Sequence, residues 1–242
     1  MRMVRRSPLL LACLWAAAPR TALAEDRDPD VAAHPDAPRG PIVEPLPAER
    51  GLQLGARLGY ALPAGPLSNS SSLNTPMSDL ETASLPIGID AGYRLSPHVY
   101  LGGTLAWGAG IAPNAAGTCP PNASCFRQDA QLRAEARYYF IPERKVAWWG
   151  SIGTGWEVAA FSQSAQGHGA TATLTGPVLA DFQLGFDVRH GALGIGPYMG
   201  VSLAEFLTHG LSPAETPEPT WIDSPTPHVW FTLGLRGAYG PW

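Results

Sequence analysis

Eight segments of the chain alternate apolar residues with small or polar ones, and a period of two is typical of β-strands with two unlike faces. In the first segment Leu52, Leu54 and Leu58 share one face, while Gln53 and Arg57 share the other. The eight segments are residues 52–62, 85–95, 99–108, 130–140, 146–157, 178–189, 193–203 and 229–239. Each has the roughly 9–11 residues that a tilted strand needs to cross the hydrocarbon of a membrane.

The connections between these segments alternate in length. Three of them are short, at residues 96–98, at residues 141–145 and around His190 and Gly191, and the other four are much longer. In an antiparallel barrel alternate connections emerge at opposite rims, so the short turns gather at one end and the long loops at the other. We therefore predict an all-β fold over residues 51–242, an eight-stranded antiparallel up-and-down transmembrane β-barrel with short periplasmic turns and long extracellular loops.

The polar faces carry charges of both signs, six cationic and five anionic. One cationic residue on the lipid face costs roughly 2–4 kcal/mol at the bilayer midplane, so several would exceed a typical stability of about 5–15 kcal/mol. The charges must therefore face the lumen, where they can pair and fill a narrow barrel. The predicted lumen charge network is Arg57, Asp90, Arg94, Arg133, Glu135, Arg137, Glu157, Asp181, Asp187, Arg189 and Arg236. We expect a plugged interior without a wide pore.

The apolar faces carry aromatic residues near both ends of the strands, as the two interfacial belts of a membrane barrel require. Those near the loop ends are Tyr60, Trp107 and Trp156. Those near the turn ends are Tyr93, Tyr138, Phe140, Trp148 and Tyr239. Leu, Ile and Val between them favour a belt over a general preference of aromatic residues for strands.

The amino-terminal residues have the organisation of an export signal. Residues 1–6 carry three arginines, residues 9–18 are apolar, and Ala22-Leu23-Ala24 is a small-x-small cleavage site. We predict a secretory signal peptide at residues 1–24, cleaved during export to the outer membrane. A lipoprotein signal with an acylated Cys13 is the alternative. Residues 25–50 are rich in Pro and charge, which predicts a disordered periplasmic linker, with peptidoglycan binding as an alternative role.

Two cysteines, Cys119 and Cys125, lie in the second long loop. In an exported chain we expect them to form a disulfide. Metal binding is the alternative, but two thiols without a nearby His do not complete a zinc site. We predict no cofactor and no metal. The net charge of −4 and the single lysine, Lys145, argue against nucleic-acid binding.

The sequence resembles the small outer-membrane β-barrel family of the OmpA transmembrane-domain and OmpX kind. The resemblance covers residues 51–242 and rests on the eight strands, the belts, lumen charges such as Arg133, Glu135 and Arg137, and a last strand that ends in an aromatic residue. It implies recognition of that strand by the barrel assembly machinery, through Tyr239 or Trp242. Apolar residues of the strand are, however, out of phase with Trp242. Membrane lipid and lipopolysaccharide are the implied surroundings.

Some members of that family are lipid-A deacylases or acyltransferases, which use a Ser, a His and a carboxylate. Here His168 lies in the third long loop near Ser162 and Ser164, and His209 lies in the fourth with Glu205 and Glu215. A loop His among Ser and Gly is usually a solvated residue, so we predict no catalytic residues and a non-enzymatic protein.

Function is expected in the long loops, of which the first, 64–84, is rich in Ser and Asn, and the fourth, 207–227, is rich in Pro. They could bind an extracellular ligand or a cell-surface partner. Two alternatives remain open. A soluble lipocalin-type barrel would turn the apolar face inward, and an OmpW-like conduit for small apolar molecules would need an apolar lumen, for which Trp149 and Trp230 are the only hint.

Overall fold

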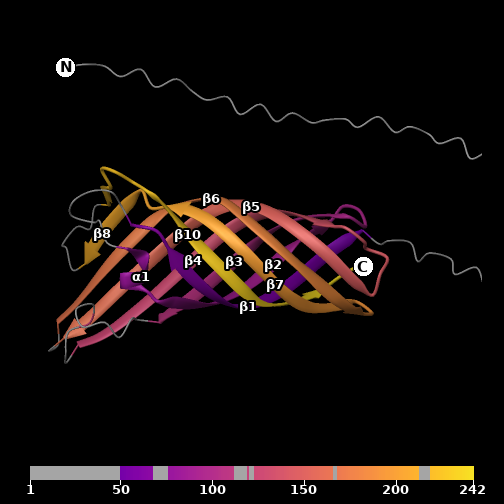
Figure 1. Ribbon diagram of the computed structural model, residues 1–242, viewed down its shortest axis with the longest axis horizontal. Coiled ribbons are helices and arrows are strands. Elements are labelled where there is room, and N and C mark those ends of the chain that lie inside the picture. The colour runs from indigo at the N-terminus through magenta and orange to yellow at the C-terminus, as the bar shows by residue number, and fades with distance from the viewer. Residues whose placement is uncertain (1–49, 68–75, 112–118, 120–122, 166–167, 213–218) are drawn as a thin grey trace, which may run out of the picture. The chain divides into compact units, whose positions relative to one another are not determined.

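The computed structural model describes residues 50–67, 76–111, 119, 123–165, 168–212 and 219–242. Within these residues eight long strands form one closed antiparallel barrel (Figure 1). They are β1 (Gly51–Ala64), β2 (Ala83–Arg94), β3 (Val99–Ile111), β4 (Ala123–Tyr139), β5 (Val146–Ala165), β6 (His168–His190), β7 (Leu193–Glu205) and β10 (Pro227–Tyr239). The shorter elements are α1 (Met77–Leu80), β8 (Thr208–Ser212) and β9 (Thr220–Trp221).

The predicted eight-stranded barrel is confirmed. Each long strand pairs with its neighbours in the chain, β1 pairs with β10, and the pairing of β5 with β6 completes the ring. The predicted signal peptide at residues 1–24, and all of the predicted linker except Arg50, lie outside the described residues. None of the helices in the described part of the chain has the length and apolarity needed to span a membrane.

The short connections join neighbouring strands at one end of the barrel. The turn between β2 and β3 is closed by a 2.9 Å hydrogen bond from the Leu95 amide to the Val99 carbonyl. Between β6 and β7, Gly191 adopts a φ of 59°, a left-handed conformation that a residue with a side chain rarely accepts. The sequence therefore encodes tight hairpins at this end, as predicted.

A β-bulge in β6 reverses the alternation of inward and outward residues along that strand. Its pairing with β7 skips Leu179, because Val178 pairs with Ala204 and Ala180 pairs with Leu203. Leu179 faces outward, whereas Val178 is fully buried inside the barrel. The prediction that Val178 lies on the outer face is therefore wrong, since a bulge adds one residue and shifts the phase of the strand.

The prediction of a third long loop, between the fifth and sixth segments, is also wrong, because β5 and β6 continue through it. β5 and β6 contain 20 and 23 residues, about twice what a membrane crossing requires. Beyond Trp156, residues 157–165 of β5 stay paired with residues 168–176 of β6, so His168 lies in a strand. The apolar alternation stops in this segment, yet its β-branched threonines still favour extended structure.

The fourth predicted loop, 207–227, contains two short strands. Two residues separate the end of β7 from the start of β8, which pairs with residues 171–175 of β6, and β9 pairs with β8. The wall of the barrel therefore continues past its rim as a small sheet (Figure 1). We call this the rim sheet: residues 157–165 of β5, residues 168–176 of β6, and all of β8 and β9.

The barrel turns its apolar residues outward and its charged residues inward. Leu132, Ile89 and Leu233 are each more than 60% exposed, at 63%, 64% and 62%. In contrast, Arg137 and Arg236 are almost completely buried. This is the arrangement expected of a barrel in lipid, and a soluble barrel with the opposite orientation is wrong for this chain.

Apolar clusters occupy the inside of the barrel toward its two ends. The cluster at the loop end includes Met77 of α1, which the turn of helix places over the lumen, and the fully buried Phe206. Its other members are Ala61, Leu67, Ala159, Leu174, Ile222 and Trp230. The cluster toward the turns consists of Tyr100, Tyr139, Ala147, Trp149 and Tyr198, with Trp242 packed against it.

Candidate functional site

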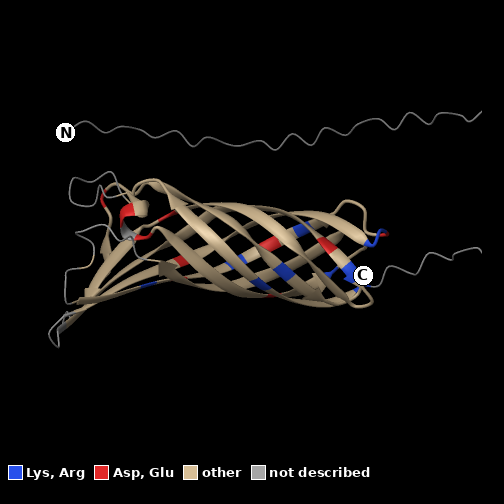
Figure 2. Cartoon of the chain, turned by 60° about the horizontal axis from the view of Figure 1, so that its bottom comes forward, with Lys and Arg blue, Asp and Glu red and all other residues tan. Residues whose placement is uncertain are grey.

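Charged side chains line the lumen between the two apolar clusters. Acidic positions gather at the end of the barrel that holds α1, whereas both signs occur along the rest of the wall (Figure 2). We call the group in the turn-side half the paired cluster, and it consists of Arg57, Asp90, Glu135, Arg137, Asp187 and Arg236. Its three guanidinium groups face three carboxylates, so its formal charges cancel.

Arg57 of β1 joins β2 and β4 within the paired cluster. Its Nε lies 2.9 Å from Asp90 Oδ1, and its Nη2 lies 2.9 Å from both oxygens of Glu135. Both partners are buried, so the pairs are shielded from water. Buried ion pairs persist only when their desolvation is offset by good geometry and further hydrogen bonds, and Arg57 has both.

Arg236 makes the second bridge across the lumen. Its Nη1 lies 2.9 Å from Asp187 Oδ2 and its Nη2 lies 3.1 Å from Asp90 Oδ2. Arg137 completes the group by pairing with Glu135. Asp90 thus accepts from Arg57 and Arg236, which lie on β1 and β10, the two strands where the barrel closes.

Aromatic rings support the paired cluster from the turn side. The Arg137 guanidinium carbon lies 4.7 Å from the ring centroids of Tyr100 and Trp149, and that of Arg236 lies 5.5 Å from Trp149. Cations over aromatic faces are stabilised, and more strongly so when both are desolvated. Trp149, which the sequence placed on the lumen side, therefore packs against charge and does not form an apolar wall.

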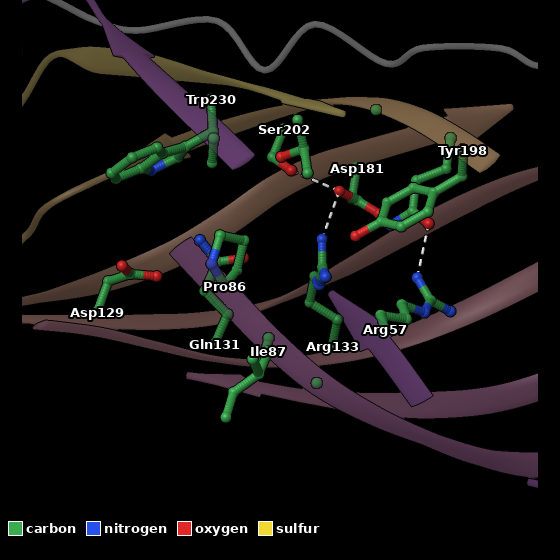
Figure 3. A pocket seen from close by; sticks show the side chains of 16 residues that line it. Arg57, Pro86, Ile87, Asp129, Gln131, Arg133, Asp181, Tyr198, Ser202 and Trp230 are labelled. Atoms are coloured by element: carbon green, nitrogen blue, oxygen red, sulfur yellow. Dashed lines mark hydrogen bonds and ion pairs between the residues drawn. The ribbon is translucent and has the colours of Figure 1, made fainter. Parts of the chain in front are cut away.

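A smaller polar group continues the network toward the loops. Arg133 Nη1 lies 2.6 Å from Asp181 Oδ1, and the amide of Gln183 donates to the other Asp181 oxygen at 2.7 Å. Gln183 also accepts from Arg57 at 2.6 Å, so the two groups are connected. In Figure 3 Arg133 and Ser202 point toward Asp181. The hollow beside them measures about 30 Å³, which is room for about two water molecules.

The loop-side half of the lumen holds a different group, which we call the acidic cluster: Glu81, Asp129 and Glu157. Ser84 Oγ donates to Asp129 Oδ1 at 2.6 Å. The Trp230 indole donates to Glu157 Oε1 at 3.0 Å, and His228 Nε2 lies 3.3 Å from Glu157 Oε2.

Glu81 is the least compensated member of the acidic cluster. It is 2% exposed, and its Oε1 has no hydrogen-bond partner among the described residues. Burial, reinforced by the neighbouring Asp129 carboxylate, raises the pKa of Glu81 to about 8, although Arg127 opposes the shift. The site is crowded, because a Cβ on Gly110 would lie 2.6 Å from Glu81 Oε1. Glu81 therefore holds a proton at neutral pH.

The predicted lumen charges separate into three places. Eight of them lie in the paired cluster or in the group around Asp181, and Glu157 lies in the acidic cluster. Arg94 and Arg189 lie at the turn-side mouth, where their guanidinium groups stack over the rings of Tyr139 and Trp242. The Trp242 indole donates to the Ala192 carbonyl at 2.8 Å.

Four titratable members of the loop-side lumen were not predicted from the sequence: Glu81, Arg127, Asp129 and His228. Arg127, Asp129 and His228 lie in strands that begin earlier than the predicted segments. Arg127 and Asp129 keep the phase of Gln131 and Arg133, so the period of two already indicated that they face inward. Glu81 carries no such signal, because its position depends on the turn formed by α1.

The predicted belt residues all lie on the outer face, where each is exposed. Trp107 and Trp156 lie toward the loops, with the Trp107 indole donating to Gln128 at 3.2 Å. Tyr138 and Phe140 lie toward the turns, with ring centroids 5.7 Å apart. Tyr239, at 65% exposed, points outward on the last strand, whereas Trp242 is held at the mouth.

Other chemistry considered from the sequence is not assembled among the described residues, and Glu215 lies outside them. Cys119 and Cys125 are joined in a disulfide with their Cα atoms 5.9 Å apart, so the metal alternative for these thiols is wrong. Among the residues that the structure describes, no group of three or more His, Cys, Asp and Glu side chains is placed to hold a metal ion. Ser162 Oγ lies 3.0 Å from Thr171 Oγ1, and His209 lies in β8.

Neither a protein-family model nor a curated protein matches the chain. Several solved structures are similar in fold. The major outer membrane protein from Thermus thermophilus is 13% identical, over 78% of this chain and 98% of that one, with a TM-score of 0.46. Ail from Yersinia pestis is 11% identical, over 80% and 100%, with a TM-score of 0.41. Neisserial surface protein A is 14% identical, over 77% and 95%, with a TM-score of 0.39.

Strand pairing and the placement of side chains define the class of this protein independently of those structures. Eight antiparallel strands of the described chain close on themselves, their outer face is apolar with aromatic residues toward both ends, and their charges are buried in the lumen. These are the properties of a small outer-membrane β-barrel.

Proposed function

We propose that this protein is a non-conducting and non-enzymatic barrel of the outer membrane, which acts through the loops and the rim sheet that it holds beyond the membrane. The signal peptide predicted at residues 1–24 would direct it there. Lipid and lipopolysaccharide would surround its outer face. The barrel assembly machinery would recognise the last strand through Tyr239, which is exposed on the lipid side, whereas Trp242 is packed into the mouth.

One observation carries the proposal: the lumen is filled. Three arginines and three carboxylates of the paired cluster bridge the barrel from wall to wall, and the hollow on their loop side measures only about 30 Å³. A wide aqueous path requires a larger barrel with an unfilled interior. The apolar cluster around Met77 and Phe206 covers the other end.

The same contacts argue against the conduit for apolar molecules. Trp149 is stacked by Arg137 and Arg236, and Trp230 is bonded to Glu157. Both indoles are buried, so neither lines an open path. The absence of catalysis is part of the proposal, supported by the pairing of Ser162 with Thr171, since a nucleophile needs a base within hydrogen-bond reach.

Planar-bilayer recording tests the filled lumen. We expect the wild-type protein to give no stable conductance steps after insertion. As a positive control, a variant with Arg57, Glu135, Asp187 and Arg236 all changed to Ser removes two cations and two anions and should conduct. Both proteins must first migrate differently before and after boiling, which shows a closed barrel. Large stable steps from the wild type would overturn the proposal.

A further inference from the structure

The outward face of the rim sheet differs in chemistry from the outward face of the barrel below it. Residues 158, 160, 162 and 164 of β5 and residues 171, 173 and 175 of β6 continue the outward phase of Trp156. None of these described positions is charged, and five of the seven are Ser or Thr. The apolar outer surface therefore changes to a hydroxyl surface just past the belt.

Neighbouring strands bring these hydroxyls into rows. Thr175 pairs with Thr208 of β8, and their Oγ1 atoms lie 2.7 Å apart. Thr171 pairs with Ser162 of β5, with their hydroxyl oxygens 3.0 Å apart. Residues directly opposite each other on paired strands share a face, so these side chains form one surface. Hydroxyls can donate and accept, so each retains hydrogen-bonding capacity for a ligand.

An exposed aromatic ring flanks this hydroxyl surface. Trp221 of β9 pairs with Thr208 of β8 and therefore lies on the same face. It is 70% exposed, and it is the most exposed large apolar side chain of the described residues. Against β6 and β8 lies a hollow of about 290 Å³, lined by Thr171, Thr173, Thr175, Thr208, His209 and Pro219 among others, and Trp221 lies next to this lining through its pairing with Thr208. A flat ring beside hydroxyls in a shallow hollow fits a sugar, whose C–H face packs on the ring while its hydroxyls bond to the threonines.

The position of the hollow along the barrel indicates which sugar it would meet, that of the surrounding glycolipid. Thr175 lies two residues and Thr171 six residues beyond Pro177, which pairs with the belt residue Trp156, so they lie about 7–20 Å farther along the strand. This distance reaches past the hydrocarbon into the headgroup region of the outer leaflet, and the face points away from the barrel axis. An open hollow binds weakly, but a face surrounded by glycolipid meets its ligand at a high local concentration.

We infer that Thr171, Thr173, Thr175, Thr208 and Trp221 form a binding site for uncharged sugar units of the glycolipid, lipopolysaccharide, in the membrane that holds the barrel. The inference rests on the proposed function, because the face meets glycolipid only if the barrel is inserted in an outer membrane. No Lys or Arg lines the hollow, so it favours sugar hydroxyls over the phosphate groups of lipid A, which strong cationic donors bind best.

The test compares thermal unfolding, read by heat-modifiable gel mobility, in bilayers with complete lipopolysaccharide and in bilayers with lipid A alone. For the wild type we expect a midpoint about 2–4 °C higher with the complete glycolipid. Trp221→Ala and the triple variant Thr171→Val, Thr173→Val, Thr175→Val should lose this difference. Val keeps the shape and strand preference of Thr, so the triple variant should still fold.

Two variants serve as matched controls. Thr220 pairs with His209 and so lies on the opposite face of β9, and Thr220→Val should keep the full difference. Trp156→Ala, in the belt, should lower the midpoint equally in both bilayers. A wild-type midpoint that is the same in both bilayers overturns the sugar site. Loss of heat-modifiable mobility in every bilayer would instead overturn the proposed function.

Discussion

The two halves of the lumen are closed by different means. On the turn side, three arginines and three carboxylates cancel one another within one buried network. On the loop side, three carboxylates face Arg127 and His228, and an apolar cluster around Met77 lies over them. The first half depends on every partner being present, whereas the second depends on a proton at Glu81. Stability should therefore respond to charge deletion on the turn side and to pH on the loop side.

Breaking the turn-side balance should give the largest effect. Arg236→Met leaves the buried Asp187 without its ion-pair partner, and removal of one partner of a buried pair costs about 3–5 kcal/mol. The double variant Arg236→Met, Asp187→Leu removes both charges and should recover most of this loss. Urea unfolding in detergent micelles, followed by gel mobility, measures both. Equal losses from the single and double variants would contradict a balanced network.

The loop-side half should respond to pH through Glu81. Its pKa is about 8 in the folded barrel and near the ordinary value of 4.5 when exposed, so folding takes up a proton between these values. The stabilisation from this proton is complete below pH 4.5 and is lost above about pH 8. Between these values it declines by at most about 1.4 kcal/mol per pH unit.

Glu81→Gln should remove this dependence, because the amide mimics the protonated acid. Relative to the wild type we expect no difference at pH 4.5 and a more stable variant at pH 9, by about 1–3 kcal/mol after solvent relaxation. Urea midpoints at pH 4.5, 7 and 9 test this. Asp79→Asn, an exposed acid in the same turn, is the matched control and should change none of them. A constant difference between Glu81→Gln and wild type at all three values would contradict the proton at Glu81.

Removing the Trp242 side chain from the turn-side mouth should lower the free energy of unfolding by less than either change above. Trp242→Ala removes the 2.8 Å hydrogen bond to the Ala192 carbonyl and the stacking of Arg94 and Arg189, for a loss of about 1–2 kcal/mol. Trp242→Phe keeps the ring and should lose about half as much. Unfolding midpoints of the two variants decide this, and equal midpoints would mean that the stacking contributes nothing.

The sequence predicted the regular part of this molecule well, because the period of two is enforced by lipid outside and charge inside. That rule placed Arg57 and Arg137 toward the lumen and Leu58 toward lipid. It failed at Val178, where a bulge shifts the phase without altering the local composition. The alternation between apolar and polar residues also does not predict strands beyond the membrane, because their outer face no longer contacts lipid.

For that reason the sequence predicts loops where the rim sheet lies. Its Thr and Ser residues are polar on a face that the apolar pattern ignores. After the break at Phe206 and Leu207, β8 runs in the same direction as β7 and pairs with a part of β6 that lies more than 30 residues away in the sequence. Glu81 was missed for a related reason, since α1 returns it to the lumen from outside every predicted strand. Local patterns thus revealed the barrel wall, while the contacts that close its loop end are non-local.

The smallest effect should come from charges outside the lumen, and it sharpens the contrast between the two halves. Arg144 lies exposed in the turn between β4 and β5, in contrast to the buried Arg236. Arg144→Ala should change the free energy of unfolding by no more than about 0.5 kcal/mol, because an exposed charge is already solvated in both states. Urea unfolding beside Arg236→Met makes the comparison directly. A loss from Arg144→Ala as large as that from Arg236→Met would mean that net charge, and not buried pairing, holds the turn-side lumen together.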